Sequence, residues 1–368
     1  MEDITINNLN SISRQQLNDK KSRINSIDIA KAIGIFFIVL GHVLEFGELR
    51  KFIYAFHVPL FFFLSGLCFS RKENLTFVKK KILSIYVPYV IISIISIAIY
   101  ATFGKFIGAS NVNIIDNIKG MLYANPNLGN MQWNQPLWFL PSLMIQLILI
   151  NFFENFIFNL KHKKYIRTLM LICLCVLGYV LSFYKIHLPF QLEAALCMLI
   201  FTYAGIFIKN NREKLTNNQL ISKIIDKKYL IIVLLIASLV ISVILERNNS
   251  TVSVMLDNYG NYFIYIVVNI LMIFNIMLLS NLIDKALKKQ RIISFIGQNT
   301  LIILLIHKFP ILFFQKVCPF IKDILNKNDT VLNNLMGILI SLIVIAMCII
   351  LKYFINLIVL RRNKNDTN

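Results

Sequence analysis

The side chains best suited to chemistry lie in the first apolar run, where a lysine and a histidine interrupt an otherwise membrane-like sequence. Lys31 and His42 are eleven residues apart. That spacing is close to three turns of an α-helix, so both are expected on one face, roughly 16 Å apart along the axis. Glu45 follows about one turn later and is predicted to orient the imidazole. Ionisable side chains inside membrane helices are costly and therefore mark candidate functional sites.

Two more histidines are predicted at the depth of His42. His57 lies in the second run, which a short turn folds back on the first, and His307 lies about fifteen residues into the ninth run. Histidine suits proton transfer near neutral pH, so we expect a buried polar chamber with His42 as the base. Packing hydrogen bonds or metal ligation are alternatives, but no HxxxH-type pair is present and no metal is expected. His162 and His187 are expected to be solvated loop residues.

Basic side chains after the second run could hold the phosphates of a donor substrate. They are Arg71, Lys79, Lys80 and Lys81, and lysine suits phosphate as a point charge. Lys31 would join them at the cytoplasmic entrance. The alternative for the basic stretch is that it only fixes the orientation of the helices in the membrane. The alternative for Lys31 is that its side chain extends along the helix so that the ammonium group reaches the membrane surface.

Trp138 opens the fourth apolar run, between two prolines. A tryptophan at the outer membrane interface is typical of an aromatic belt. The other interpretation is a surface on which a sugar ring stacks, so Trp138 is a candidate substrate-binding residue.

The candidate site residues described above are predicted to lie in or beside membrane-spanning helices. Of 368 residues, 57% are hydrophobic and only 15% are charged, with a mean hydropathy of +0.68. Soluble domains carry about 25% charged residues, and runs of about 20 apolar residues match bilayer thickness. We therefore predict an all-α, polytopic transmembrane bundle of about 10 helices. The apolar runs are at 29–47, 51–70, 82–103, 137–160, 166–184, 190–208, 229–246, 261–281, 292–315 and 335–358.

The basic residues between these runs set the predicted orientation. The N-terminal tail, the even-numbered loops and the C-terminus carry 26 lysines and arginines, and the other loops carry 9. Both termini are therefore predicted to be cytoplasmic. We expect one membrane domain at 28–360, with a flexible cytoplasmic tail at 1–27 and a cytoplasmic C-terminal tail at 361–368. The net charge of +20 is spread between the runs, which argues against a nucleic-acid partner.

Four segments together resemble acyltransferase family 3, the membrane O-acyltransferases that modify surface glycans. Lys31 and His42 look like the family's signature of a basic residue and a histidine separated by ten others. Phe56–Gly66, Leu137–Leu140 and Ile296–Thr300 with His307 are similar to the fucose 4-O-acetylase-like branch. The basic stretch departs from the family because it is mostly lysine where arginine is common.

The resemblance implies acyl-CoA, most simply acetyl-CoA, as a cytoplasmic donor and a cell-surface or lipid-linked glycan hydroxyl as acceptor. His42 would act as general base or accept the acyl group briefly. We expect a multi-pass protein of a bacterial cytoplasmic membrane, in contact with membrane lipid; nothing in the sequence fixes its oligomeric state. A transporter or flippase of lipid-linked glycans is the alternative, and it would release no free thiol from acyl-CoA.

Overall fold

The chain folds into a bundle of helices in a computed structural model that describes residues 25–104, 113–216, 227–286, 291–318, 325 and 330–365. Within those ranges the only β feature is an isolated bridge between Ser253 and Asn258. The predicted all-α membrane bundle is therefore confirmed. Most of the predicted N-terminal tail, and residues 366–368 of the C-terminal one, lie outside the described residues.

The helices follow the predicted apolar runs closely. The main ones are α2 (Asn25–Val43), α3 (Glu48–Leu67), α4 (Asn74–Lys81), α5 (Val87–Phe103), α7 (Phe139–Ile157), α8 (Lys163–Phe183), α9 (Leu192–Cys197), α10 (Leu199–Asn210), α13 (Lys228–Arg247), α14 (Tyr262–Ala286), α15 (Arg291–Gln298), α16 (Thr300–Ile306), α17 (Lys308–Val317) and α19 (Val331–Asn365). Among the described residues, seven helices are long and apolar enough to cross a membrane, or eight if the bent pair α9–α10 is one span.

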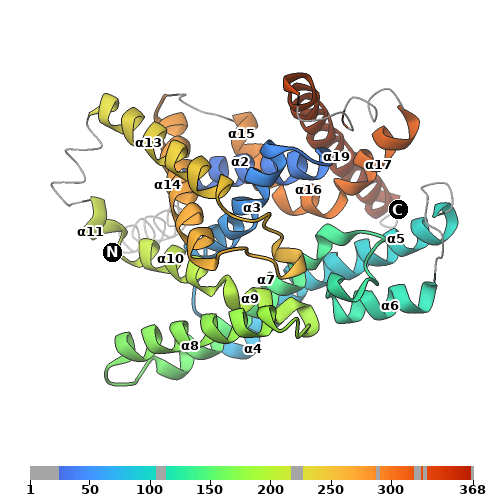
Figure 1. Cartoon of the computed structure of the whole chain (residues 1–368). Coiled ribbons are helices and arrows are strands. Elements are labelled where there is room, and N and C mark those ends of the chain that lie inside the picture. Colours follow the sequence, from blue (N-terminus) through green and yellow to red (C-terminus); the bar gives the residue numbers. More distant parts are fainter. Residues whose placement is uncertain are drawn as a thin grey trace, which may run out of the picture.

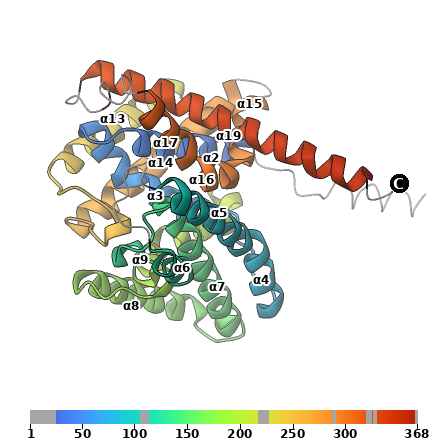
Figure 2. The ribbon, with the colours of Figure 1, turned by 90° about the vertical axis from the view of Figure 1, so that its right-hand side faces the viewer.

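Helix α2 lies at the centre of the bundle. It packs against α3, α14, α15, α16 and α19, and Figure 1 shows it surrounded by these helices. Helices α8 and α13 lie at the periphery and expose large apolar side chains such as Leu169 and Ile236, as expected for lipid-facing helices. Helix α19 has 35 residues, more than a bilayer requires, and its C-terminal part extends beyond the other helices in Figure 2.

The ninth apolar run is not one helix but three short ones, α15, α16 and α17. The chain breaks at Asn299 and again at His307. Pro310 explains the second break, because a proline inside a helix removes a backbone hydrogen bond to the fourth residue before it. His307 therefore lies at a break in the helix within the bundle.

Close backbone contact fixes α15 against α2. A Cβ atom added to Gly297 would lie 1.8 Å from the carbonyl oxygen of Asp28, an impossible contact. The Gln298 side chain also donates to Asp28 Oδ2 at 3.4 Å. Only glycine permits this approach. The contacts of Gly297 and Gln298 with Asp28 therefore set the position of α15, α16 and α17 along the axis of α2.

The long loop between α5 and α7 is partly helical. It contains α6 (Ile114–Tyr123) and two short 3₁₀ turns, Pro126–Leu128 and Gln135–Trp138. Asn125 from this loop donates to the carbonyl of Leu188, and Asn127 donates to Asp257. Three loops that the charge count assigns to the outer side thus meet at one end of the molecule.

Candidate active site

His42 and His307 face each other at one end of the bundle. Their ring centroids are 5.3 Å apart, although 265 positions separate them in the sequence. The backbone contact at Gly297 and the break before Pro310 bring the second ring to the level of the first. His307 is completely buried, whereas His42 is half-buried, so His42 is the ring that a substrate can reach.

Helix α3 adds a tyrosine, a histidine and an arginine to this pair. Tyr54 Oη lies 3.4 Å from His42 Nδ1, and its ring lies 5.1 Å from that of His57. The Arg50 guanidinium carbon lies 4.2 Å from the centroid of the Tyr54 ring, and its buried Nε has no hydrogen-bond partner among the described residues. A basic, titratable cluster therefore surrounds His42.

The backbone sets the tautomers of the two buried histidines. His57 Nδ1 lies 2.8 Å from the carbonyl of Ile53, and His307 Nδ1 lies 3.0 Å from that of Ile303. A carbonyl only accepts, so both Nδ1 atoms must carry the proton and the neutral rings keep a lone pair on Nε2. His307 Nε2 is buried and has no partner in the described part of the chain. It is therefore free to accept a proton.

Glu45 does not occupy the predicted orienting position. Helix α2 ends at Val43, so Glu45 is not on the next helical turn after His42. It is exposed, and its carboxylate accepts a hydrogen bond from Gln315 on α17 at 3.2 Å. Tyr54 is the side chain that contacts His42 where Glu45 was expected.

Lys31 lines a cavity that runs along the same face of α2. The cavity holds about 230 Å³, and its lining includes Lys31, Ile35, Ile38, Phe139 and Leu304. Ile35 and Ile38 lie four and seven residues after Lys31, on the face that reaches His42 one turn later. Lys31 Nζ is 3.7 Å from the Asp28 carboxylate, so a ligand phosphate would share this lysine with an acidic partner.

The basic stretch lies in and around α4, beside a second hollow. Lys79 and Lys80 are exposed and line a groove of about 450 Å³ with Thr76, Leu83 and Ser84. A π-helical turn, Ile82–Tyr86, follows α4. Ser84 of this turn lines the groove and Ile85 lines the Lys31 cavity, so the two hollows share one turn of backbone.

The other two members of the basic set do not line the groove. The Arg71 guanidinium carbon lies 3.4 Å from the centroid of the Phe158 ring, a stacked arrangement common for arginine. Lys81 Nζ lies 5.2 Å from the centroid of the Phe77 ring and is half-buried.

Trp138 is buried rather than placed at an exposed interface. Only 5% of it is exposed, and its ring meets Phe139 edge to face at 6.2 Å. The aromatic-belt interpretation therefore does not describe it. Phe139 lines the Lys31 cavity, so Trp138 lies one ring away from that cavity.

Arg50 and Tyr54 are candidate functional residues that the sequence interpretation missed. Arg50, Tyr54 and His57 are spaced by four and three residues, so they share one helical face that points at His42. This periodicity is readable from the sequence. The charge count places Arg50 in a loop, because the second apolar run is predicted to begin at residue 51.

The chain matches a known family of proteins. The model of acyltransferase family 3, described as an acyltransferase domain, matches residues 24–355. That range contains α2, the Lys31 cavity and the groove beside Lys79 and Lys80. It also contains the four residues around His42, which are Arg50, Tyr54, His57 and His307. No curated protein matches the chain.

Proposed function

The chain belongs to acyltransferase family 3, and from that premise we propose that it transfers an acetyl group from acetyl-CoA to a glycan hydroxyl. Family membership and the apolar helices make it a multi-pass membrane acyltransferase. The donor, the acceptor and the acetyl group are the proposal. Its main support is the half-buried His42 beside the buried His307, each about one helical turn beyond a residue that lines the Lys31 cavity, Ile38 and Leu304 respectively.

In this proposal the donor enters from the cytoplasmic side. The phosphates of the donor bind Lys79 and Lys80 in the groove, and the positive charge of Lys31 also attracts these phosphates. The flexible arm then occupies the cavity along Ile35 and Ile38 and brings the thioester toward His42. A distance of roughly 16 Å along α2 suits an extended arm. Arg71 and Lys81 contribute through the local potential, because their charged ends lie over phenylalanine rings and do not line the groove.

At the other end, His42 acts as general base. Donation of its Nδ1–H to Tyr54 Oη leaves a lone pair on Nε2, which takes the proton of the acceptor hydroxyl. The hydroxyl oxygen attacks the thioester carbonyl and an ester C–O bond forms. The C–S bond breaks, and the leaving thiolate takes the proton from His42 to give free coenzyme A.

Charge near His42 would lower the barrier. The tetrahedral intermediate carries a negative oxygen, and preorganised donors stabilise such a charge strongly in a dry site. The Arg50 Nε, buried without a partner, is the donor we propose for it. His57 and His307 position the acceptor or pass on the proton, and Trp138 supports the wall next to Phe139.

The proposed acceptor is a cell-surface or lipid-linked glycan of a bacterial cytoplasmic membrane. The glycan would meet His42 from the outer side, because Arg50 and the predicted outer loops lie at that end. Assignment to the fucose 4-O-acetylase-like branch remains a prediction.

Mass spectrometry of surface glycans tests the proposal. Cells that produce the wild-type chain should carry glycans heavier by one acetyl group than cells without it, and His42→Gln should return them to the lighter mass. Identical glycan masses in all three strains, with each protein present in the membrane, would rule out a glycan acceptor. A uniform shift to a longer acyl group would correct the donor.

A further inference from the structure

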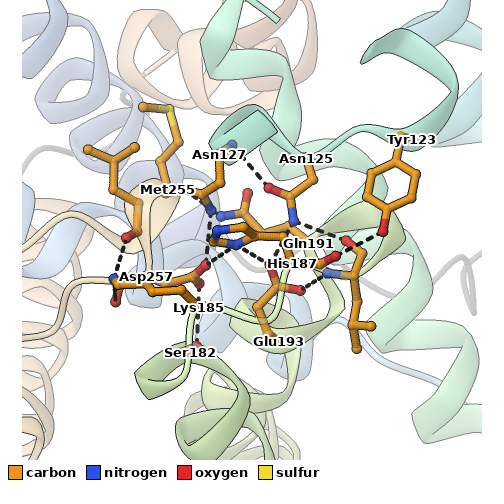
Figure 3. A network of polar contacts seen from close by, with 12 residues as sticks. Tyr123, Asn125, Asn127, Ser182, Lys185, His187, Gln191, Glu193, Met255 and Asp257 are labelled. Carbon is orange, nitrogen blue, oxygen red and sulfur yellow. Dashed lines mark hydrogen bonds and ion pairs between the residues drawn. The ribbon is translucent and has the colours of Figure 1, made fainter. Parts of the chain in front are cut away.

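One histidine and two acidic side chains lie together outside the proposed active site, where the loops predicted to be on the outer side meet. His187 follows α8, Glu193 lies in α9, and Asp257 follows the 3₁₀ turn Val254–Leu256. One ligand atom from each lies within 4.8 Å of the other two. Figure 3 shows the three side chains converging from separate segments. His187 is thus not the solvated loop residue that its sequence position predicts.

His187 lies within ion-pair distance of both carboxylates but makes no hydrogen bond with either of them. His187 Nδ1 lies 3.2 Å from Asp257 Oδ2 and 3.8 Å from Glu193 Oε1, yet it is buried and makes no hydrogen bond with any described residue. Zinc binds histidine nitrogen and carboxylate oxygen at about 2.0–2.2 Å in a tetrahedron, which spaces the ligand atoms by about 3.3–3.6 Å. The observed separations lie on either side of that spacing.

Asparagines hold the two carboxylates in place. Asn125 Nδ2 donates to Glu193 Oε1 at 2.7 Å, and Asn127 Nδ2 donates to Asp257 Oδ2 at 2.9 Å. A carboxylate oxygen can accept twice, so each still has a lone pair for a cation. Metal sites characteristically support their ligands through such outer hydrogen bonds.

A second, independent feature is the buried carboxamide of Gln191, which Figure 3 draws among the same side chains. Gln191 is completely buried, and its Oε1 has no hydrogen-bond partner in the described ranges. Its Nε2 donates to the carbonyl of Met255 at 2.6 Å, so the carboxamide bridges the segments that carry Glu193 and Asp257. A buried carboxamide oxygen without a donor is costly, and a cation would satisfy it.

The positive charge beside the cluster does not pair with its carboxylates. The nearest lysine, Lys185, donates to the backbone carbonyls of Leu256 and Asp257 at 3.1 and 3.0 Å. Its hydrogen bonds therefore go to the backbone and not to the two carboxylates.

We propose that His187, Glu193 and Asp257 form a structural site for a divalent transition-metal cation of the zinc type, with Gln191 Oε1 as a fourth donor. Imidazole with carboxylate oxygens suits zinc better than magnesium, which requires an octahedron of oxygens. The cation ties α9 and the loops after α6, α8 and α13 into one outer cap. The site is independent of the acyl-transfer chemistry.

Zinc binding to the purified full-length chain in detergent micelles tests this site. After chelation and equilibration with zinc chloride, the wild type should retain about one zinc ion per chain, and zinc should raise its melting temperature. His187→Gln and Asp257→Asn should each lose the bound zinc. Asn127→Ala keeps every ligand and should weaken zinc binding about 10- to 100-fold.

Matched substitutions elsewhere serve as controls. His162→Gln and Asp116→Asn change exposed residues of the same types and should bind zinc as the wild type does. The proposal fails if the chelated wild type retains no zinc, or if His187→Gln binds it equally well. It also fails in its choice of metal if magnesium, and not zinc, raises the melting temperature. Because the wild-type measurement decides on its own, a variant that does not fold leaves the test intact.

Discussion

At the scale of single residues, the account depends on a histidine that substrate can reach and on neighbours that prepare it. His42 is half-buried, and Tyr54 Oη is 3.4 Å from its Nδ1. The sequence predicted His42, His57 and His307 at one depth, and the structure brings His42 and His307 into contact distance. The sequence shows that Tyr54 shares a helical face with His57. It does not show that Tyr54 replaces Glu45 as the partner of His42, because that depends on α2 ending at Val43.

Tyr54→Phe should lower kcat and leave the KM for acetyl-CoA unchanged. Phenylalanine keeps the ring beneath Arg50 but cannot accept from His42 Nδ1. A neutral hydrogen bond contributes about 0.5–1.5 kcal/mol, which corresponds to a loss of about two- to tenfold in rate. Tyr100→Phe removes a hydroxyl that bonds Gln132 and serves as the control. A rise in KM with constant kcat would mean that Tyr54 binds substrate rather than positioning His42.

Lys31→Ala should raise the KM for acetyl-CoA more than the KM for the acceptor, because Lys31 lines the cavity proposed for the donor. Lys31→Arg keeps the charge and should retain most of the activity. Lys352→Ala, at a lysine that bonds Asn299 and does not line this cavity, should leave both constants unchanged. If Lys31→Ala reduces only the amount of protein in the membrane, its role lies in insertion and not in donor binding.

At the scale of elements, the sequence predicted where helices occur better than how they break. An apolar run predicts a helix whether the helix faces lipid or the core of the bundle. All ten predicted runs contain helical segments in the structure. The breaks at Asn299 and His307 and the π-helical turn Ile82–Tyr86 depend on tertiary contacts and on backbone hydrogen bonds. Pro310 was a readable signal for one of them. The contact of Gly297 with Asp28 was not, because it joins segments that are distant in sequence.

Gly297→Ala should reduce acyl transfer by moving the broken run away from α2. The added methyl group would meet the Asp28 carbonyl, and overpacking of this kind costs about 1–3 kcal/mol. His307 would shift relative to His42, so activity should fall together with the melting temperature in detergent. Ile292→Ala, at an exposed residue of the same helix, should change neither. Wild-type activity in Gly297→Ala would show that α15 does not set the position of His307.

At the scale of the whole molecule, the sidedness of the bundle links the chemistry to the cell. The count of 26 against 9 basic residues assigns the loops that carry Asn125, His187 and Asp257 to one side, and these loops do meet. Seven or eight of the described helices qualify as membrane spans, whereas the sequence has ten apolar runs. By length and composition, α3 and the broken ninth run do not qualify as spans, because charged ends or breaks interrupt their apolar stretches.

Cysteine labelling in intact cells tests the orientation. In a cysteine-free background, Lys119→Cys should react with a membrane-impermeant maleimide, because residue 119 is exposed on the predicted outer side. Lys364→Cys should react only after the membrane is opened. The reverse pattern would place both termini outside and would put Lys31 at the wrong surface for a cytoplasmic donor.

The central claim is that this chain cleaves a thioester and that His42 does the chemistry. The most direct measurement is the release of free thiol from acetyl-CoA by the purified chain in lipid vesicles, supplied with glycan acceptor from the producing cell. The wild type should release one thiol for each acetyl group found on the acceptor. His42→Gln, folded and equally abundant, should be slower by about 10² to 10⁴. Thiol release by His42→Gln at the wild-type rate would contradict the account.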